Sequence, residues 1–232
     1  MSEVIPVVVS LTSWKKRIDT CHLTIKSILE HSNPYKIVLV LSMEEFSNRE
    51  ADLPASLLEY KDSLDIIWVK QNPKAFKKVL FAVNKYREMP VISADDDCLY
   101  QEDYVKILYD KWLTDKTAMW TYKRNIDVKA FYFGHGPACL YPPYCFKEYG
   151  LRMLTKEIVD TNHDDIYYGV LAKFMCIKVK QALDDNEHVP YVFHDETEPL
   201  HDSEMDGCKC ISICVNSMMQ CITRVPEEVL IA

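Results

Sequence analysis

Glycine is scarce in this chain, because only five of its 232 residues are glycine. Glycine lets the backbone approach a ligand closely, so many binding loops that follow a strand are rich in it. The polar segment after the first predicted strand, residues 11–18, contains no glycine. A glycine-rich binding loop is therefore excluded there, whereas Gly134 and Gly136 place two of the five glycines in one later loop.

The chain also lacks an excess of positive charge and any long apolar run. It has 27 Lys and Arg residues against 35 Asp and Glu residues, a formal net charge of -8. This balance argues against a nucleic-acid partner, although a bound metal would still allow anionic phosphates to bind. With no bilayer-length run and no recognisable secretion signal, we expect no transmembrane segment and a cytoplasmic location. Peripheral attachment to a membrane is the alternative.

The chain also lacks an even number of cysteines, so they cannot all pair with one another within it. The nine cysteines are scattered and odd in number, so we expect reduced thiols rather than a disulfide framework. Cys208, Cys210 and Cys214, with His201 nearby, raise the possibility of a zinc site. Their spacing matches no standard zinc motif, and residues 210, 212 and 214 alternate like one face of a strand, so we do not expect structural zinc.

The apolar pattern of the first half alternates between strands and helices. Residues 4–11 form a nearly unbroken apolar run, as expected of a strand buried on both faces. Asp19 or Thr20 is expected to cap the following helix. Further strands are predicted at 36–41, 64–69 and 91–94, and helices at 53–60, 76–87 and 101–113. The alternation over the first 115 residues therefore predicts a parallel, doubly wound arrangement with ligands beyond the carboxyl ends of its strands. For the whole chain we expect an α/β fold with a doubly wound, mixed central sheet flanked by helices.

The second half is less regular. Strands are predicted at 117–122, 128–133 and 176–180, and a helix from Asp164 to Met175, while residues 211–222 fit either a helix or a strand. We find no linker or repeat. The expectation is one domain, residues 1–232, with halves at 1–115 and 116–232.

Three consecutive acids, Asp95, Asp96 and Asp97, close the fourth predicted strand. Strand side chains alternate between faces, which would direct Asp95 and Asp97 to one side and Asp96 to the other. Two like charges on one side favour a cation between them, and Mg²⁺ or Mn²⁺ accepts one or two carboxylates together with phosphate oxygens. A solvated acidic turn is the alternative.

Five segments carry a family resemblance in the same order along the chain. They are residues 10–18, 76–78, 92–100, 136–143 and 164–167. Together they resemble a family of small glycosyltransferases with the GT-A fold, related to family 2 and associated with bacterial surface polysaccharides and lipopolysaccharides. The resemblance covers roughly residues 4–180 and is weak beyond them.

The resemblance implies a nucleotide-sugar site in the first half. Asp95 and Asp97 match the DXD motif, which holds Mn²⁺ or Mg²⁺ against the donor diphosphate. In many GT-A enzymes a late histidine completes the metal shell, so His201 is the candidate third ligand, with a surface histidine as the alternative. The implied donor-binding residues are Thr12, Ser13, Arg17, Lys77, Lys78, Asp95 and Asp96. A solvated basic loop at 12–17 and ordinary helix-surface lysines are the corresponding alternatives.

The resemblance also implies an acceptor site in the second half. The acidic pair at the start of the predicted helix supplies the catalytic base in inverting relatives, so Asp165 is favoured and Asp164 is second. A helix cap is the alternative for both. Gly136, Tyr141 and Pro142 are expected to shape the acceptor side.

The expected function is therefore metal-dependent, hexosyltransferase-like transfer of a sugar from a nucleoside-diphosphate sugar, with a UDP-sugar favoured. The acceptor would be a glycan or glycolipid hydroxyl and the outcome inverting. A nucleotidyltransferase of similar fold is the first alternative, but it would normally carry glycines after the first strand. A non-catalytic protein that binds nucleotide sugars or glycans is the second, but such a protein could lose the acidic residues that this chain keeps.

Overall fold

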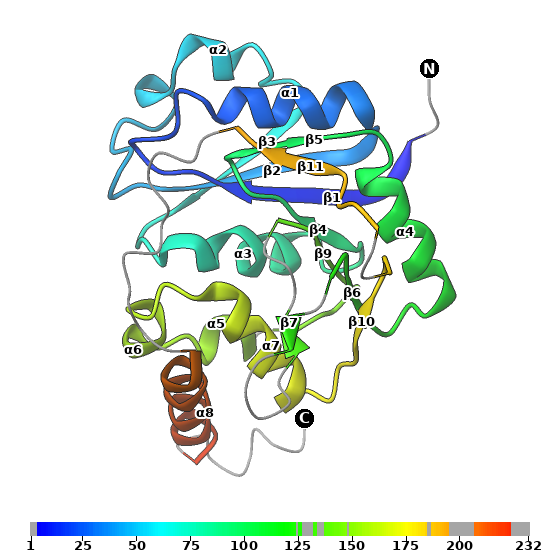
Figure 1. Ribbon diagram of the computed structural model, residues 1–232. Helices are drawn as coiled ribbons and strands as arrows, with labels where there is room; N and C mark the ends of the chain where they lie inside the picture. Colours follow the sequence, from blue (N-terminus) through cyan, green and yellow to red (C-terminus); the bar gives the residue numbers. More distant parts are fainter. Residues whose placement is uncertain are drawn as a thin grey trace.

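A seven-stranded mixed sheet forms the centre of the molecule (Figure 1). The computed structural model describes residues 4–123, 125–126, 132–133, 137–147, 149–184, 187–194 and 207–223. In spatial order the sheet contains β10 (Val179–Gln181), β6 (Met119–Thr121), β9 (Cys139–Tyr141), β4 (Val91–Ser93), β1 (Ile5–Thr12), β2 (Pro34–Ser42) and β3 (Leu64–Val69).

The four strands that come first along the chain, β1 to β4, run parallel to one another, as the strand–helix alternation predicts. β1 pairs in parallel with both β2 and β4, and β2 with β3. β9 runs antiparallel to β4 and β6, while β10 is parallel to β6, so the sheet is mixed. The carboxyl ends of β1 and β4 therefore lie next to each other at one edge of the sheet.

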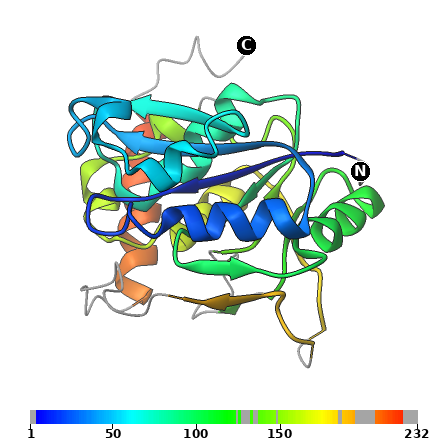
Figure 2. The same ribbon diagram turned by 90° about the horizontal axis from the view of Figure 1, so that it is seen from above.

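Helices cover both faces of the sheet (Figures 1 and 2). One face carries α1 (Cys21–His31) and α4 (Tyr104–Thr114), and α2 (Ala55–Leu58) lies beside α1. The opposite face carries α3 (Lys77–Lys85), α7 (Asp164–Phe174) and α8 (Gly207–Thr223), together with the short helices α5 (Tyr149–Arg152) and α6 (Lys156–Val159). There are also two two-stranded sheets: β5 (Cys98–Tyr100) with β11 (Tyr191–Phe193), and β7 (Asn125–Ile126) with β8 (Tyr132–Phe133). Two short 3₁₀ helices, Arg49–Asp52 and Lys74–Phe76, complete the described elements.

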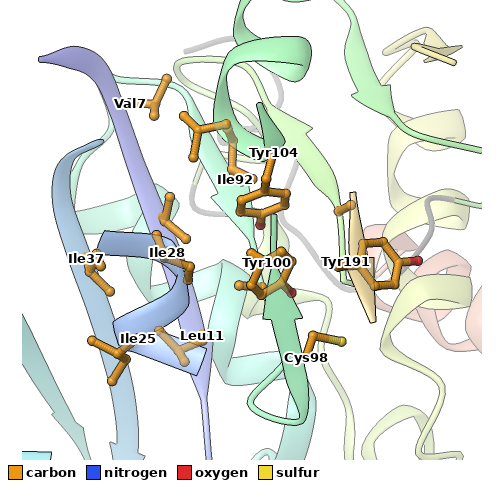
Figure 3. Close-up of a cluster of buried hydrophobic side chains, with 14 of the residues drawn as sticks. Val7, Leu11, Ile25, Ile28, Ile37, Ile92, Cys98, Tyr100, Tyr104 and Tyr191 are labelled. Carbon is orange, nitrogen blue, oxygen red and sulfur yellow. The ribbon is translucent and has the colours of Figure 1, made fainter. Parts of the chain in front are cut away.

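Alternation along β1 divides the core into two clusters. Val7, Val9 and Leu11 face α1, whereas Val8 faces α3, and all four are fully buried. Figure 3 shows the first cluster, in which Tyr100 and Tyr104 extend the aliphatic packing of the sheet toward β11. Because both faces of β1 are covered, its sequence is apolar at almost every position.

Some predicted elements differ from the observed ones. Residues 211–222, which fit either a helix or a strand, belong to α8. Cys210 and Cys214 therefore lie one helical turn apart on a buried face, and the interpretation of residues 210, 212 and 214 as one face of a strand was wrong. The strand predicted at 176–180 begins only at Val179. Thr20 is the N-cap residue of α1, but its hydroxyl accepts no hydrogen bond from the first turn of the helix and instead donates to the Arg17 carbonyl. Most of the strand predicted at 128–133 lies outside the described residues.

Among the helices that the structure describes, none is both long enough and apolar enough to span a bilayer.

Candidate functional site

The segment after β1 meets the acidic turn after β4 at the carboxyl edge of the sheet. The hydroxyl of Thr12 donates to the Val40 carbonyl of β2 at 2.6 Å, so this side chain ties two strands together. The hydroxyl of Ser13 donates to Asp96 Oδ2 at 2.5 Å. Both residues are buried, which assigns the start of this segment to the framework of the site rather than to a solvated loop.

Arg17 organises the acidic turn. Its Nη1 lies 2.8 Å from Asp96 Oδ1 and 3.0 Å from Asp97 Oδ2, and the Arg17 side chain is buried. Asp96 and Asp97 thus share one guanidinium, while Asp95 pairs elsewhere. Strand alternation predicted a different division because β4 ends at Ser93 and the acids lie in the turn that follows. Nη1 of the Arg17 guanidinium is thus engaged by two acids of the turn.

The three acids differ in their surroundings. Burial raises the pKa of Asp96, and Arg17 and Ser13 act against this effect. Burial, together with the negative charge of Asp95, raises the pKa of Asp97 to about 6 despite the ion pair with Arg17. At Asp97, burial and the neighbouring carboxylates therefore outweigh the positive charge of Arg17. Asp95 is the more exposed of the two outer acids, since 27% of its side chain is accessible against 18% for Asp97.

Lys78 connects this turn with the start of α7. Its Nζ lies 2.7 Å from Asp95 Oδ1 and 3.0 Å from Asp164 Oδ2, and only 5% of its side chain is exposed. Burial acts to lower the pKa of Lys78, but the carboxylates of Asp164 and Asp95 outweigh it and raise the pKa above its usual value. The two acidic motifs, far apart in the sequence, are thus joined by one buried ammonium group.

Lys77 precedes Lys78 on α3 but faces a different environment. Its Nζ donates to Asn72 Oδ1 and to the Lys74 carbonyl, each at 3.0 Å. Burial lowers the pKa of Lys77 to about 8, although the charges of Glu45 and Asp96 oppose this shift. Both lysines are therefore buried at the site, and neither is a helix-surface charge.

The acidic pair of α7 begins the helix without acting as its N-cap. The N-cap residue is His163, which forms no side-chain cap hydrogen bond. Asp164 is buried and turned toward Lys78, and Asp165 is half-buried and accepts the Ile166 backbone N–H at 2.8 Å. Lys74 of the α3 side donates to Asn162 Oδ1 at 2.5 Å, a second link between the halves of the site.

Two of the expected acceptor-side residues, Tyr141 and Pro142, are buried. Tyr141 belongs to β9 and is 3% exposed in the core, where its ring contacts Phe146 and Tyr168 edge-on. Pro142 is buried directly after it. Gly136 lies outside the described residues. His201, the expected third metal ligand, lies outside them as well.

His194 reaches the acidic turn although no motif pointed to it. β11 pairs with β5, the strand that follows the turn, and the His194 N–H donates to the Asp97 carbonyl at 2.8 Å. One of its ring nitrogens lies 3.3 Å from the hydroxyl of Thr24. Its position depends on strand pairing between residues about a hundred positions apart in the printed sequence, so no local signal could have identified it.

A divalent cation is compatible with the acids but is not enclosed by them. Among the described residues, no cluster of three or more His, Cys, Asp or Glu side chains is arranged as a metal site. Mg²⁺ and Mn²⁺ do not require such a cluster, because they bind through one or two carboxylates and complete their shell with water and phosphate oxygens. The partly exposed, mutually repelling Asp95 and Asp97 fit this mode of binding.

The comparison with known proteins adds no assignment: no protein-family model matches the chain, and no curated protein matches it.

Proposed function

We propose that this chain is a metal-dependent glycosyltransferase of GT-A architecture that uses a nucleoside-diphosphate sugar, with a UDP-sugar favoured. The observation that carries the proposal is the contact of Lys78 with both Asp95 and Asp164. A transferase must hold the donor diphosphate and the acceptor hydroxyl next to each other. The contact brings Asp95, a proposed metal ligand, and Asp164, the neighbour of the proposed base Asp165, to one ammonium group. The mixed seven-stranded sheet is compatible with this architecture.

Asp95 and Asp97 are the residues that would hold Mn²⁺ or Mg²⁺. When bound, the ion would neutralise negative charge that builds on the departing nucleoside diphosphate. Arg17 and Ser13 fix the acidic turn from its buried side, while the carboxylates of Asp95 and Asp97 keep partial exposure. In this assignment Thr12, Ser13, Arg17 and Asp96 form the supporting layer of the donor site. Lys77 lies on the side of β2 and β3, where it would serve the nucleotide.

Asp165 is the residue that we propose as the base. Its neighbour Asp164 is engaged by Lys78, so its carboxylate is committed to an ion pair, whereas Asp165 is more accessible. A carboxylate within hydrogen-bond reach of the acceptor hydroxyl removes its proton as that oxygen attacks the anomeric carbon, which gives inversion. The N-terminus of α7 stabilises negative charge at both positions.

The acceptor would be a glycan or glycolipid hydroxyl. A glycolipid acceptor would bring the protein to the cytoplasmic surface of a membrane. A nucleotidyltransferase is less favoured because residues 11–18 lack glycine. A non-catalytic binding protein would not need the second acidic pair.

Donor binding tests the metal-dependent part of this proposal. Calorimetry with UDP-, GDP-, CMP- and dTDP-sugars is expected to detect tight binding of one of them with Mn²⁺ and a large loss of affinity in EDTA. Asp95→Asn should reproduce the loss without chelator, because it removes a proposed metal ligand and leaves the shape of the side chain unchanged. Equal binding of the same nucleotide with and without EDTA would contradict the metal role.

The base assignment predicts a specific loss of turnover. Asp165→Asn should lower turnover roughly 10²–10⁴-fold, the usual contribution of general base catalysis, while donor affinity stays close to that of the wild type. The measurement is sugar transfer with the donor found by calorimetry. Asp164→Asn is the matched control at the adjacent position, and a larger loss of turnover in that variant would exchange the two roles. Near-normal transfer in both would remove the proposed base.

A further inference from the structure

Lys78 is the buried counter-cation of two carboxylates that come from different parts of the chain. Its Nζ contacts Asp95 in the acidic turn and Asp164 at the start of α7. The Asp164 side chain is 9% exposed, and the Lys78 side chain 5%. Buried carboxylates are costly unless a cation compensates their charge. Without Lys78, Asp95 and Asp164 would carry an uncompensated negative charge in a poorly solvated place.

The same ammonium group lies where it would oppose a divalent cation. An ion held by Asp95 and Asp97 would share the Asp95 carboxylate with a positive charge 2.7 Å from Asp95 Oδ1. Charges of like sign at such distances repel strongly outside bulk water. Asp97 instead forms its ion pair with Arg17. The lysine and the ion thus compete for Asp95.

We infer that Lys78 is a positioning residue whose ammonium group takes the place of the divalent cation at Asp95 in the metal-free protein. When the ion binds, this group would give up its contact with Asp95 and keep the one with Asp164. The inference rests on the metal site of the proposed function. It identifies Lys78 as an internal part of the site rather than a ligand of the donor phosphate. It also couples the two sides of the site, because the ion then determines how strongly Lys78 holds Asp164, and such coupling is reciprocal.

The test uses Mn²⁺ alone, without donor or turnover. Calorimetry should show that Lys78→Met binds Mn²⁺ roughly ten-fold more tightly than the wild type or better, because a competing positive charge is gone. Thermal unfolding should show a lowered midpoint in EDTA that Mn²⁺ largely restores. Lys77→Met is the matched control: it removes a buried lysine one residue away that pairs with neither Asp95 nor Asp164, so its Mn²⁺ affinity should stay near that of the wild type.

Asp164→Asn tests the inference in the opposite direction and decides the matter if Lys78→Met does not fold. This variant removes one of the two carboxylates that contact Lys78 and leaves it with Asp95, so Mn²⁺ should bind several-fold more weakly than to the wild type. A purely structural role of Lys78 predicts unchanged Mn²⁺ affinity in Asp164→Asn, and that result would overturn the inference. Lys78→Met with unchanged or weaker Mn²⁺ affinity would overturn it too.

The outcomes separate this inference from the proposed function. If the wild type binds Mn²⁺ and the variants bind it equally well, Lys78 does not compete, while the proposed transferase stands. If no variant and no wild-type protein binds Mn²⁺, the inference fails together with the metal site. Sugar transfer in EDTA would then show whether the transferase proposal survives in a metal-independent form.

Discussion

The two lysines that begin α3 are both buried, but their ammonium groups meet opposite surroundings. Lys78 contacts two carboxylates, which raise its pKa above the usual value against the effect of burial. Lys77 contacts an amide oxygen and a backbone carbonyl, which carry no full charge, so burial dominates and its pKa falls to about 8. Neutral oxygen acceptors satisfy the hydrogen bonds of an ammonium group but do not balance its charge.

The lowered pKa of Lys77 predicts a pH-dependent stability. The unfolded chain keeps this proton up to about pH 10.5, whereas the folded protein releases it near pH 8. The unfolded state therefore binds more protons between these values, so the contribution of Lys77 to the free energy of unfolding increases as the pH rises through this window. The increase should be about 3 kcal/mol over the whole range.

Urea unfolding at several pH values measures this effect as the difference between the wild type and Lys77→Met. All other titrating groups are common to the two proteins and cancel. The difference should change in favour of the wild type between pH 8 and 10.5 and stay constant below pH 7. A difference that is constant from pH 6 to 10.5 would show that the folded protein keeps this lysine charged.

At the scale of elements, Gly150 allows α5 to pack closely against its neighbours because it has no side chain. A Cβ at Gly150 would lie 2.9 Å from Leu80 Cδ2 of α3 and 3.1 Å from Phe146 Cβ. The Gly150 carbonyl also accepts the hydroxyl of Tyr167 in α7. One glycine thus lets α5 lie against the two helices that supply Lys78 and the Asp164–Asp165 pair.

Gly150→Ala should therefore destabilise the protein by about 1–2 kcal/mol, because overpacking forces neighbours apart. Denaturant unfolding measures the loss. The matched test is a double-mutant cycle with Leu80→Ala, which removes the nearest clashing atom. Gly150→Ala should cost less in that background than in the wild type, and equal costs would mean that Leu80 is not the obstacle.

The elements differ in how far their sequences specify them. β2 extends the predicted 36–41 at both ends, and its buried residues 37–42 are apolar at nearly every position. β3 is observed at the predicted residues 64–69, although it is an edge strand whose four central residues are only partly buried. β6, β9, β10 and β11 have three residues each, too few to establish a period. In α8, Ile211, Ile213 and Val215 alternate like a strand, and only its packing against α6 and α7 reveals a helix.

The site shows the same division between local and distant information. The acidic turn and the start of α7 could be located because acids at the end of a strand or the start of a helix leave a mark in the sequence. The contact between these two segments through Lys78 could not be predicted, because it forms only when α3 and α7 pack on the same face of the sheet. The approach of His194 to Asp97 likewise depends on β11 adding to β5.

At the scale of the whole molecule, the nine thiols differ in how far they are buried, so their reactivity measures how well the core is shielded from solvent. All nine are free, six of them are buried, and Cys176 is exposed, with Cys208 and Cys221 in between. Burial raises the pKa of both Cys139 and Cys214 to about 12, which suppresses the reactive thiolate. Reactivity should therefore follow exposure.

A thiol reagent in excess should modify Cys176 first and Cys208 and Cys221 more slowly in the folded protein. The remaining six should react only at the rate of unfolding, and denaturant should expose nine thiols in total. Mass spectrometry of time points identifies the order. Rapid modification of Cys210 or Cys214 in native buffer would show that α8 separates from α7, and fewer than nine thiols in denaturant would indicate disulfides or bound metal.

The pairing of β11 with β5 also governs when the site is completed during synthesis. The acidic turn and β5 leave the ribosome early, together with the strands that support them, whereas α7 and β11 follow only after most of the chain has been made. A nascent chain can therefore fold the parallel half of the sheet first, as contacts close in sequence form before distant ones. Until Asp164 and His194 emerge, Lys78 has only Asp95 beside it and the edge of β5 is open. Premature termination before β11 would thus yield a chain that lacks α8 and the His194 contact and that leaves a strand edge open to association.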